Sequence, residues 1–170
     1  MNPCRILFIC TANSARSILA EATLNALGRP RFEAYSAGSQ PSGQVHPLAL
    51  ATLHAAGLPT EGLASKSWDR FVEADPQTMD IVITLCDHAA HQPCPVWLGD
   101  CVRSHWGLPD PAAVQANKEV ACAVFRQTHQ HITKRLQALL AIPVETLSST
   151  RLLQALERIG QIPAPEDEPT

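Results

Sequence analysis

The sequence has little net charge and lacks long apolar runs. Its 13 Lys and Arg residues against 16 Asp and Glu residues give a formal net charge of −3, so there is no basic footprint for nucleic acid or for an acidic membrane surface. No uninterrupted apolar run approaches the roughly 20 residues of a membrane-spanning helix, and residues 1–5 show no signal peptide. These absences predict a cytoplasmic protein that binds neither nucleic acid nor membranes.

What the chain does have is an ordinary core and many thiols. Its 170 residues, of which 45% are apolar, suit one domain with a substantial core. Its six cysteines are expected to be thiols in the reducing cytoplasm. Thiols in that setting indicate catalysis, redox cycling or metal binding rather than a disulfide framework.

Apolar segments of strand length alternate along the chain with helical patterns. Strands are predicted at 6–10, 31–37, 80–86 and 96–98, and helices at 17–27, 47–57, 67–73, 112–140 and 148–159. Such alternation predicts a three-layer α/β/α fold with a four-stranded parallel sheet. In a flavodoxin-like strand order, 2-1-3-4, the carboxyl ends of the first and third strands lie side by side at the switch point.

The first predicted strand ends in a C-x5-R-S motif that runs from Cys10 to Arg16 and Ser17. The small residues in between allow the loop to surround a tetrahedral oxyanion, with the Cys10 sulfur below its central atom. The predicted oxyanion-binding residues are Thr11, Ala12, Asn13, Ser14, Ala15 and Arg16. The same positive potential favours a Cys10 thiolate, and Ser17 is placed to hydrogen-bond it. The alternative is a buried strand-end cysteine and a surface arginine.

Of two further thiols, Cys86 ends the third predicted strand and Cys94 lies in the loop after it. The predicted strand order brings Cys86 to the same crevice as Cys10, and a bend in the loop would bring Cys94 within disulfide reach of Cys86. The three thiols could then act as a relay, each attacking the sulfur before it. The alternatives are unrelated buried thiols, or a zinc site made by Cys86, His88, His91 and Cys94, whose spacing departs from usual zinc motifs.

Asp110 lies between Pro109 and Pro111, which fix its backbone and disfavour a helix there. A rigid carboxylic acid beside an oxyanion loop can protonate a departing oxygen. A role in a turn or as a helix cap explains the same residue equally well.

These segments together resemble low-molecular-weight protein tyrosine phosphatases and, more narrowly, the arsenate reductases built on that fold. The matching segments, in chain order, are 10–17, 35–38, 83–87, 94–97 and 105–111. The last of them, His105-Trp106-Gly107 followed by Asp110-Pro111, is characteristic of the reductases. Several matches in the same order are far more specific than any one of them.

The resemblance implies roles for the residues of the motif. Cys10 would be the nucleophile, and Arg16 with the loop amides would hold the anion. Ser17 would stabilise the thiolate, Asn13 would brace the loop and Asp110 would be the acid.

The resemblance also implies a redox relay, with Cys86 as the resolving thiol and Cys94 as the thiol that exposes the oxidised pair to a reductant. No tightly bound cofactor is expected, because thioredoxin or glutathione and glutaredoxin would supply the electrons. The expected ligand is arsenate, with phosphate and sulfate as competing oxyanions. The expected organisation is a monomer with a catalytic domain at 1–140, a helical extension at 141–160 and a disordered tail at 161–170.

Some positions depart from the family pattern. Ala12 stands where the commonest loop has glycine, and therefore needs a backbone angle that alanine can adopt. Family members that bind potassium use residues matching Asn13, Glu21 and Ser36 together with an acid from a later loop. By spacing that last position is Trp68 here, so we expect no metal site.

Reduction and phosphate hydrolysis begin alike, with attack by Cys10, and then diverge. A phosphatase needs water to finish the reaction, whereas a reductase needs a second thiol to attack the Cys10 sulfur. Cys86 and Cys94 serve only the second path. Ala112 and Ala113 also follow Asp-Pro, where phosphatases commonly carry aromatic residues. We therefore expect an arsenate reductase, with a tyrosine phosphatase or a non-catalytic metal- or oxyanion-binding module as alternatives.

Overall fold

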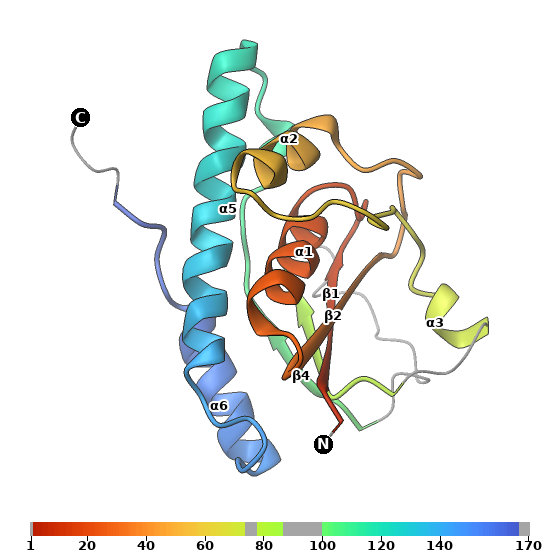
Figure 1. Ribbon diagram of the computed structural model, residues 1–170, viewed down its shortest axis with the longest axis vertical. Coiled ribbons are helices and arrows are strands. Elements are labelled where there is room, and N and C mark those ends of the chain that lie inside the picture. Colours follow the sequence, from red (N-terminus) through yellow and green to blue (C-terminus); the bar gives the residue numbers. More distant parts are fainter. Residues whose placement is uncertain (1, 74–77, 87–99, 167–170) are drawn as a thin grey trace.

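The computed structural model describes residues 2–73, 78–86 and 100–166. Within these ranges, four strands form one parallel sheet in the order β2-β1-β3-β4 (Figure 1). Their bounds are β1 Cys4–Cys10, β2 Phe32–Gly38, β3 Ile81–Thr84 and β4 Val102–His105. The predicted α/β class, the parallel pairing and the strand order are confirmed.

Helices flank the sheet on both sides, most of them on one side. They are α1 Arg16–Gly28, α2 Pro47–Ala55, α3 Arg70–Glu73, α5 Lys118–Leu140 and α6 Ser149–Gly160, with a 3-10 turn at Pro111–Ala113. In Figure 1, α1, α5 and α6 lie on one side of the sheet and α3 lies on the other. No helix among the residues described is long and apolar enough to cross a membrane.

The central strand β1 is buried on both faces. Ile6 and Phe8 belong to the larger core cluster, which also contains residues of α1, α2, α5 and α6. Leu7 and Ile9 point to the opposite face, where the cluster includes Phe71 of α3. Burial on both faces explains why this strand is a continuous apolar run in the sequence.

The fourth strand differs from its predicted position. The segment 96–98 lies outside the described residues, and the strand that pairs with β3 is Val102–His105, with Thr84 opposite His105. Its side chains alternate between half-buried and exposed, and it stands at the edge of the sheet. An edge strand needs few apolar residues, which is why this one gives no apolar run.

The long helix α5 begins later than its predicted start at residue 112. The Asp110 side chain accepts a hydrogen bond from Ala112 N at 3.0 Å and caps a separate 3-10 turn. The helix itself starts at Lys118, where the Asn117 side chain accepts from Val120 N at 2.9 Å. Two capping side chains thus divide the segment into a turn and a helix.

The predicted last helix is present as α6, and it packs against β4 and the residues that follow it. Trp106 is 2% exposed, and its Nε1 donates to the Leu156 carbonyl at 2.9 Å. A Cβ atom on Gly160 would lie 2.8 Å from Trp106 Cδ1. Only glycine therefore allows the end of α6 to lie this close to the indole ring.

Candidate active site

The β1–α1 loop (residues 11–15) joins the end of the central strand to α1. Cys10, just before it, is 2% exposed, and its Sγ lies 2.9 Å from the Oγ of Ser17. Asn13 Nδ2 donates to the same Oγ at 2.8 Å. Because the Ser17 oxygen accepts this hydrogen bond, its own proton is free to point at the sulfur. The arrangement can stabilise a thiolate at Cys10.

Ser17 is the first residue of the helix predicted at 17–27, but it does not cap the observed helix. The helix α1 begins at Arg16 after Ala15 and has no side-chain cap. The Ser17 hydroxyl is buried toward Cys10 instead. The first amides of α1 are thereby left without a capping side chain, and together with the helix dipole they favour an anion at this end.

The backbone of the β1–α1 loop is held from outside by the segment that follows β2. The loop carbonyls of Thr11, Ala12 and Ser14 accept hydrogen bonds from the amides of Gln40, Ser42 and His46 at 3.0, 3.0 and 2.9 Å. A trans peptide places its N–H opposite its C=O. The amides of the next residues therefore face the other side of the loop, where the oxyanion is expected.

Asn13 is the residue that turns the loop. Its φ is 46°, in the left-handed region that asparagine tolerates better than most side chains. It is fully buried, and its Oδ1 accepts from the Lys66 amide at 2.9 Å. No other non-glycine residue of the described chain has a positive φ. The alanine at position 12 is therefore compatible with the loop.

Gly38 at the end of β2 is a residue that the sequence reasoning matched but gave no role. A Cβ atom there would lie 2.4 Å from the Thr11 carbonyl oxygen. The absence of a side chain lets β2 approach the β1–α1 loop this closely. Its own N–H donates to Lys66 O at 2.9 Å, which fixes the later loop beside it.

Arg16, the first residue of α1, and Asp110, which follows β4, approach each other through their side chains. Arg16 Nη1 donates to the Leu108 carbonyl at 3.0 Å, and its Nη2 lies 3.8 Å from Asp110 Oδ2. The Arg16 side chain is 12% exposed and that of Asp110 is 41% exposed. Asp110 thus caps the 3-10 turn and also reaches the predicted anion-binding arginine, so the two interpretations of this residue are compatible.

Cys86 follows β3 and lies against the β1–α1 loop. Its side chain is buried, and its Sγ lies 3.3 Å from Thr11 Oγ1. Cys86 and Cys10 belong to the same core cluster. The structure therefore brings the two predicted thiols to one side of the sheet, as the strand order implies.

The remaining predicted thiol and the histidines of the zinc alternative cannot be placed in this way. Cys94, His88 and His91 lie outside the described residues. In the part of the chain that the structure describes, no group of three or more His, Cys, Asp and Glu side chains could hold a metal ion.

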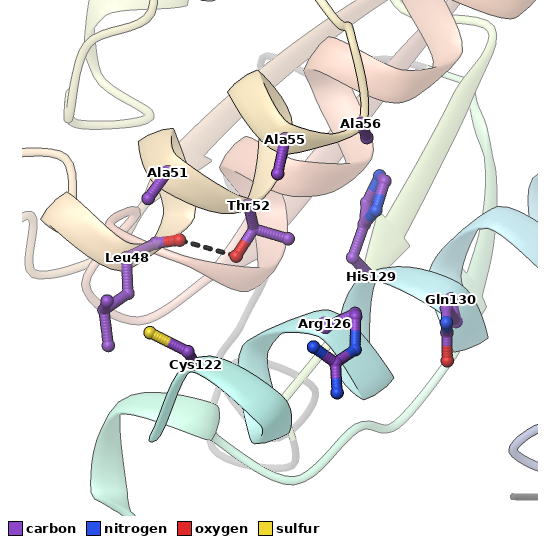
Figure 2. Close-up of a pocket in the computed structure, with 9 residues that line it drawn as sticks. All are labelled: Leu48, Ala51, Thr52, Ala55, Ala56, Cys122, Arg126, His129 and Gln130. Carbon is purple, nitrogen blue, oxygen red and sulfur yellow. Dashed lines mark hydrogen bonds between the residues drawn. The ribbon is translucent and has the colours of Figure 1, made fainter. Parts of the chain in front are cut away.

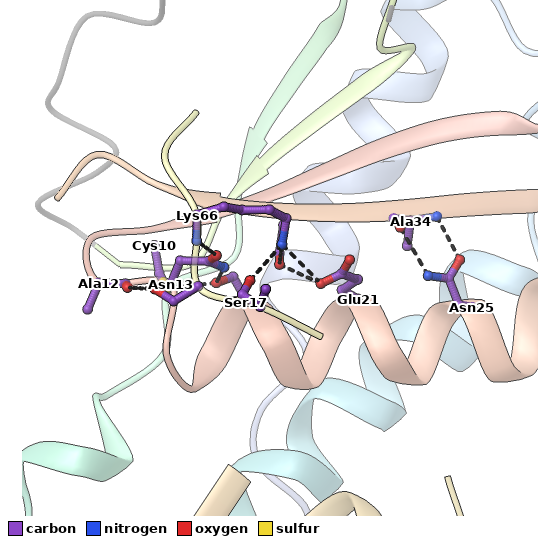
Figure 3. Close-up of polar contacts among 11 residues, drawn as sticks. Cys10, Ala12, Asn13, Ser17, Glu21, Asn25, Ala34 and Lys66 are labelled. Atoms are coloured by element: carbon purple, nitrogen blue, oxygen red, sulfur yellow. Dashed lines mark hydrogen bonds and ion pairs between the residues drawn. The ribbon is translucent and has the colours of Figure 1, made fainter. Parts of the chain in front are cut away.

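Lys66 occupies the place that spacing assigned to Trp68. Its Nζ lies 3.7 Å from Glu21 Oε2 and donates to Ser36 Oγ at 3.3 Å and to Ala64 O at 2.8 Å (Figure 3). Ser36 Oγ in turn donates to Glu21 Oε2 at 2.6 Å. The Lys66 ammonium group therefore contacts both the Glu21 carboxylate and the Ser36 hydroxyl, while the Lys66 backbone amide donates to Asn13.

The Lys66–Glu21 pair is shielded from water. Both side chains are 13% exposed. Burial raises the pKa of the Glu21 carboxyl and lowers the pKa of the Lys66 ammonium, and the attraction between the two opposes both shifts. Neither charge would be well compensated without the other. The lysine sits in a short polar segment, so its sequence gives no sign of this burial.

A separate pocket lies between α2 and α5 (Figure 2). It is lined by Leu48, Ala51, Thr52, Ala55, Ala56, Cys122, Arg126, His129 and Gln130. None of these residues belongs to the β1–α1 loop or is one of the predicted site residues. His129 faces inward to Thr23, with 2.9 Å between Nε2 and Oγ1. The oxyanion chemistry is therefore not located in this pocket.

Comparison of the sequence with known proteins identifies a phosphatase family model and several arsenate reductases. The family model described as low molecular weight phosphotyrosine protein phosphatase matches residues 5–152. An arsenate reductase of Halalkalibacterium halodurans is 36% identical over 137 residues, covering 81% of this chain and 95% of the relative. A glutaredoxin arsenate reductase of Synechocystis sp. is 30% identical over 137 residues, covering 81% and 96%.

Solved structures show the same likeness. An arsenate reductase in the phosphate binding state has a TM-score of 0.67 and 27% identity, over 83% of this chain and 98% of that one. The Corynebacterium glutamicum thioredoxin-dependent arsenate reductase has a TM-score of 0.55 and 26% identity, over 80% of this chain and 63% of that one. By its sequence match and its sheet, the chain belongs to the low molecular weight phosphotyrosine protein phosphatase family.

Proposed function

We propose that this chain is an arsenate reductase that starts its chemistry at Cys10. The observation that supports this most is the position of Cys86, whose Sγ lies 3.3 Å from the side chain of Thr11, the residue next to Cys10. A phosphatase has no use for a second thiol there, and the relatives named above are arsenate reductases.

In the first step the Cys10 thiolate attacks arsenic and one arsenate oxygen departs. Arg16 and the amides of the β1–α1 loop neutralise the remaining oxygens, while Asp110 protonates the departing oxygen so that it leaves as water. The hydrogen bond from Ser17 helps to hold Cys10 as the thiolate before the attack. The product is an arsenic–sulfur bond at Cys10.

In the second step the Cys86 thiolate attacks the Cys10 sulfur. A Cys10–Cys86 disulfide forms, the arsenic–sulfur bond breaks, and its electron pair remains on arsenic, which leaves as arsenite after taking up a proton. The two thiols are thereby oxidised by two electrons and arsenic is reduced from the pentavalent to the trivalent state. This is thiol exchange with arsenite as the leaving group.

The enzyme must then be reduced. We propose that Cys94 attacks Cys86, which frees Cys10 and leaves a Cys86–Cys94 disulfide for an external thiol donor. Relatives are named for glutaredoxin and for thioredoxin, and both are candidate donors. Such donors act in a reducing compartment, so we place the enzyme in the cytoplasm. We propose that it works as a monomer.

A phosphatase is the second candidate, because the family model that matches the chain is that of a phosphatase. Steps on phosphate would use the same Cys10, Arg16 and Asp110 and would end with hydrolysis by water. We expect this reaction as a slow side activity.

The test is arsenite production with thioredoxin and thioredoxin reductase, and separately with glutathione and glutaredoxin, for the wild type and Cys86→Ser. The variant should lose arsenate turnover with both donors and retain slow hydrolysis of p-nitrophenyl phosphate. Cys122→Ser, which changes a partly exposed thiol of α5, is the matched control and should keep both activities. Wild-type arsenite production by Cys86→Ser would disprove the relay.

A further inference from the structure

Arg135 on α5 is a buried guanidinium with unusual partners. Arg135 is only 5% exposed, and this burial lowers the pKa of its guanidinium group. Its hydrogen bonds go to backbone carbonyls, and no carboxylate of the described residues lies within ion-pair distance. A buried cation without a carboxylate is costly to keep. Its charge is therefore compensated mainly by the hydrogen bonds that it donates to these carbonyls.

Those hydrogen bonds join two segments that are far apart in the sequence. Arg135 Nη1 donates to the Gly107 carbonyl at 3.3 Å. Its Nε and Nη2 both donate to the Ile162 carbonyl, at 3.3 and 3.2 Å. His131 Nε2, one turn earlier on α5, also contacts the Ile162 carbonyl at 2.7 Å. The planar guanidinium thus connects the residues after α6 to the loop after β4.

The loop after β4, residues 106–110, is the one that carries Asp110; we call it the Trp106 loop. Its next carbonyl, that of Leu108, accepts from Arg16 Nη1 at 3.0 Å, and the Leu108 amide donates to Leu85 O at 3.0 Å. Two arginines therefore hold neighbouring carbonyls of one loop, Arg135 from α5 and Arg16 from the first residue of α1.

The Asp110 carboxylate itself makes few contacts that could fix its position. Its carboxylate is 41% exposed, caps its own 3-10 turn through Ala112 N, and stands 3.8 Å from Arg16. The place of this carboxylate relative to a bound oxyanion is consequently set by the backbone of the Trp106 loop. A displacement of about 1 Å at a reacting group can cost a hundredfold in rate.

We propose that Arg135 is a positioning residue for the acid Asp110, and that the C-terminal segment acts on the reaction through it. The family match ends at residue 152, so most of α6 and Ile162 lie beyond it. The C-terminal segment of this chain is thus a structural part of its active site. The inference rests on the proposed function, in which Asp110 protonates the departing oxygen.

The test compares two phosphate ester substrates whose leaving groups differ in their need for a proton, which separates acid catalysis from the rest of the reaction. Phenolate needs protonation when it departs from phosphate, whereas p-nitrophenolate needs little. We would measure the first turnover of phenol and of p-nitrophenol release for the wild type, Arg135→Met and Arg135→Lys. The exposed Arg126→Met on the same helix is the matched control and should match the wild type on both substrates.

We expect Arg135→Met to slow phenol release about tenfold more than p-nitrophenol release, as misplacement of a general acid predicts. Arg135→Lys, which keeps the charge, should recover part of the loss. In an Asp110→Asn background, Arg135→Met should add no further difference between the two substrates. Equal losses on both substrates, or a difference that persists without Asp110, would show that Arg135 only stabilises the fold.

The experiment gives different results if the Arg135 proposal is wrong and if the proposed arsenate reductase function is wrong. First-turnover phenol release requires neither Cys86 nor an electron donor, so it reports on Asp110 whether or not arsenite is produced. Urea unfolding of each variant measures stability alone. If Arg135→Met proves too unstable to purify, Arg135→Lys carries the same comparison: a substrate-dependent loss supports the proposal and an equal loss overturns it.

Discussion

The β1–α1 loop and the Trp106 loop form two sides of one site but are held in different ways. The β1–α1 loop is fixed from within the fold, because Asn13 and Ser17 are fully buried and its carbonyls are hydrogen-bonded to the segment after β2. The Trp106 loop is fixed by two guanidiniums, and its Asp110 is 41% exposed. The proposed nucleophile Cys10 is therefore enclosed by buried side chains, whereas we expect the position of the proposed acid Asp110 to depend on distant residues.

Replacing the acid itself should have the largest effect. Asp110→Asn keeps the cap on Ala112 N but cannot donate a proton, so arsenate turnover should fall about a hundredfold or more. Stability to urea should stay within about 0.5 kcal/mol of the wild type. Asp69→Asn, an exposed carboxylate of the same size, is the control. Unchanged turnover would leave Asp110 with its capping role alone.

A substitution at Gly38 that displaces the β1–α1 loop should have the second largest effect. An added Cβ would stand 2.4 Å from Thr11 O, so Gly38→Ala must push the loop away. We expect about a hundredfold loss of arsenate turnover and a lower free energy of unfolding by about 1–3 kcal/mol. Gly28→Ala, which is crowded by Leu24 and Phe32, should cost stability but little activity. Similar activity losses in both would mean that the effect is not local.

Breaking the buried ion pair between Lys66 and Glu21 should mainly affect stability. Lys66→Met leaves Glu21 buried without its counter-charge, and the free energy of unfolding should fall by about 3 kcal/mol. Glu21→Gln in the same chain should recover much of this loss, since no lone charge then remains. The exposed Lys134→Met should change stability by less than about 0.5 kcal/mol. A double variant as unstable as the sum of the single variants would argue against coupling.

The smallest effect should be a pH dependence of stability that involves neither loop. Burial lowers the pKa of His129 below its usual value near 6.5. As the pH falls below 6.5, the unfolded chain takes up a proton before the folded chain does, so stability decreases and then levels off below the folded pKa.

His129→Gln should flatten this decrease in urea unfolding measured between about pH 7.5 and about pH 5, a range that includes the unfolded pKa. The pKa of His131 is also lowered by burial, so a smaller slope of the same sign should remain, and His131→Asn should remove it. A slope unaffected by either variant would assign the pH dependence to other groups. First-turnover rates of His129→Gln should equal those of the wild type, because its ring faces Thr23 and lies outside both loops.

The sequence predicts best what local pattern determines. The apolar run of β1, the small residues after Cys10 and the apolar stripe of α6 each have their own signal. The alternation of strands and helices predicts the parallel pairing, whereas the strand order is expected by analogy with a flavodoxin-like sheet. The edge strand β4 has one apolar residue, Val102, so it gives no such signal.

The contacts that the sequence did not predict join segments that are distant from each other in the chain. Lys66 lies 45 positions after Glu21 and looks like a surface lysine until the loop folds back on Asn13. Arg135 contacts Gly107 across 28 positions and Ile162 across 27, while its own helix pattern marks it only as polar. Their burial follows from tertiary packing, which no local pattern encodes.

The order of these contacts along the chain has a consequence during synthesis. All the residues that surround Cys10 are translated before α6, and the Ile162 carbonyl that anchors Arg135 comes later still. Because domains fold as the nascent chain emerges, the surroundings of the proposed nucleophile Cys10 can form on the ribosome before the contacts of Arg135 with Ile162 do. If Arg135 positions Asp110 as proposed, a newly made chain acquires its full reactivity only after α6 and Ile162 have been translated.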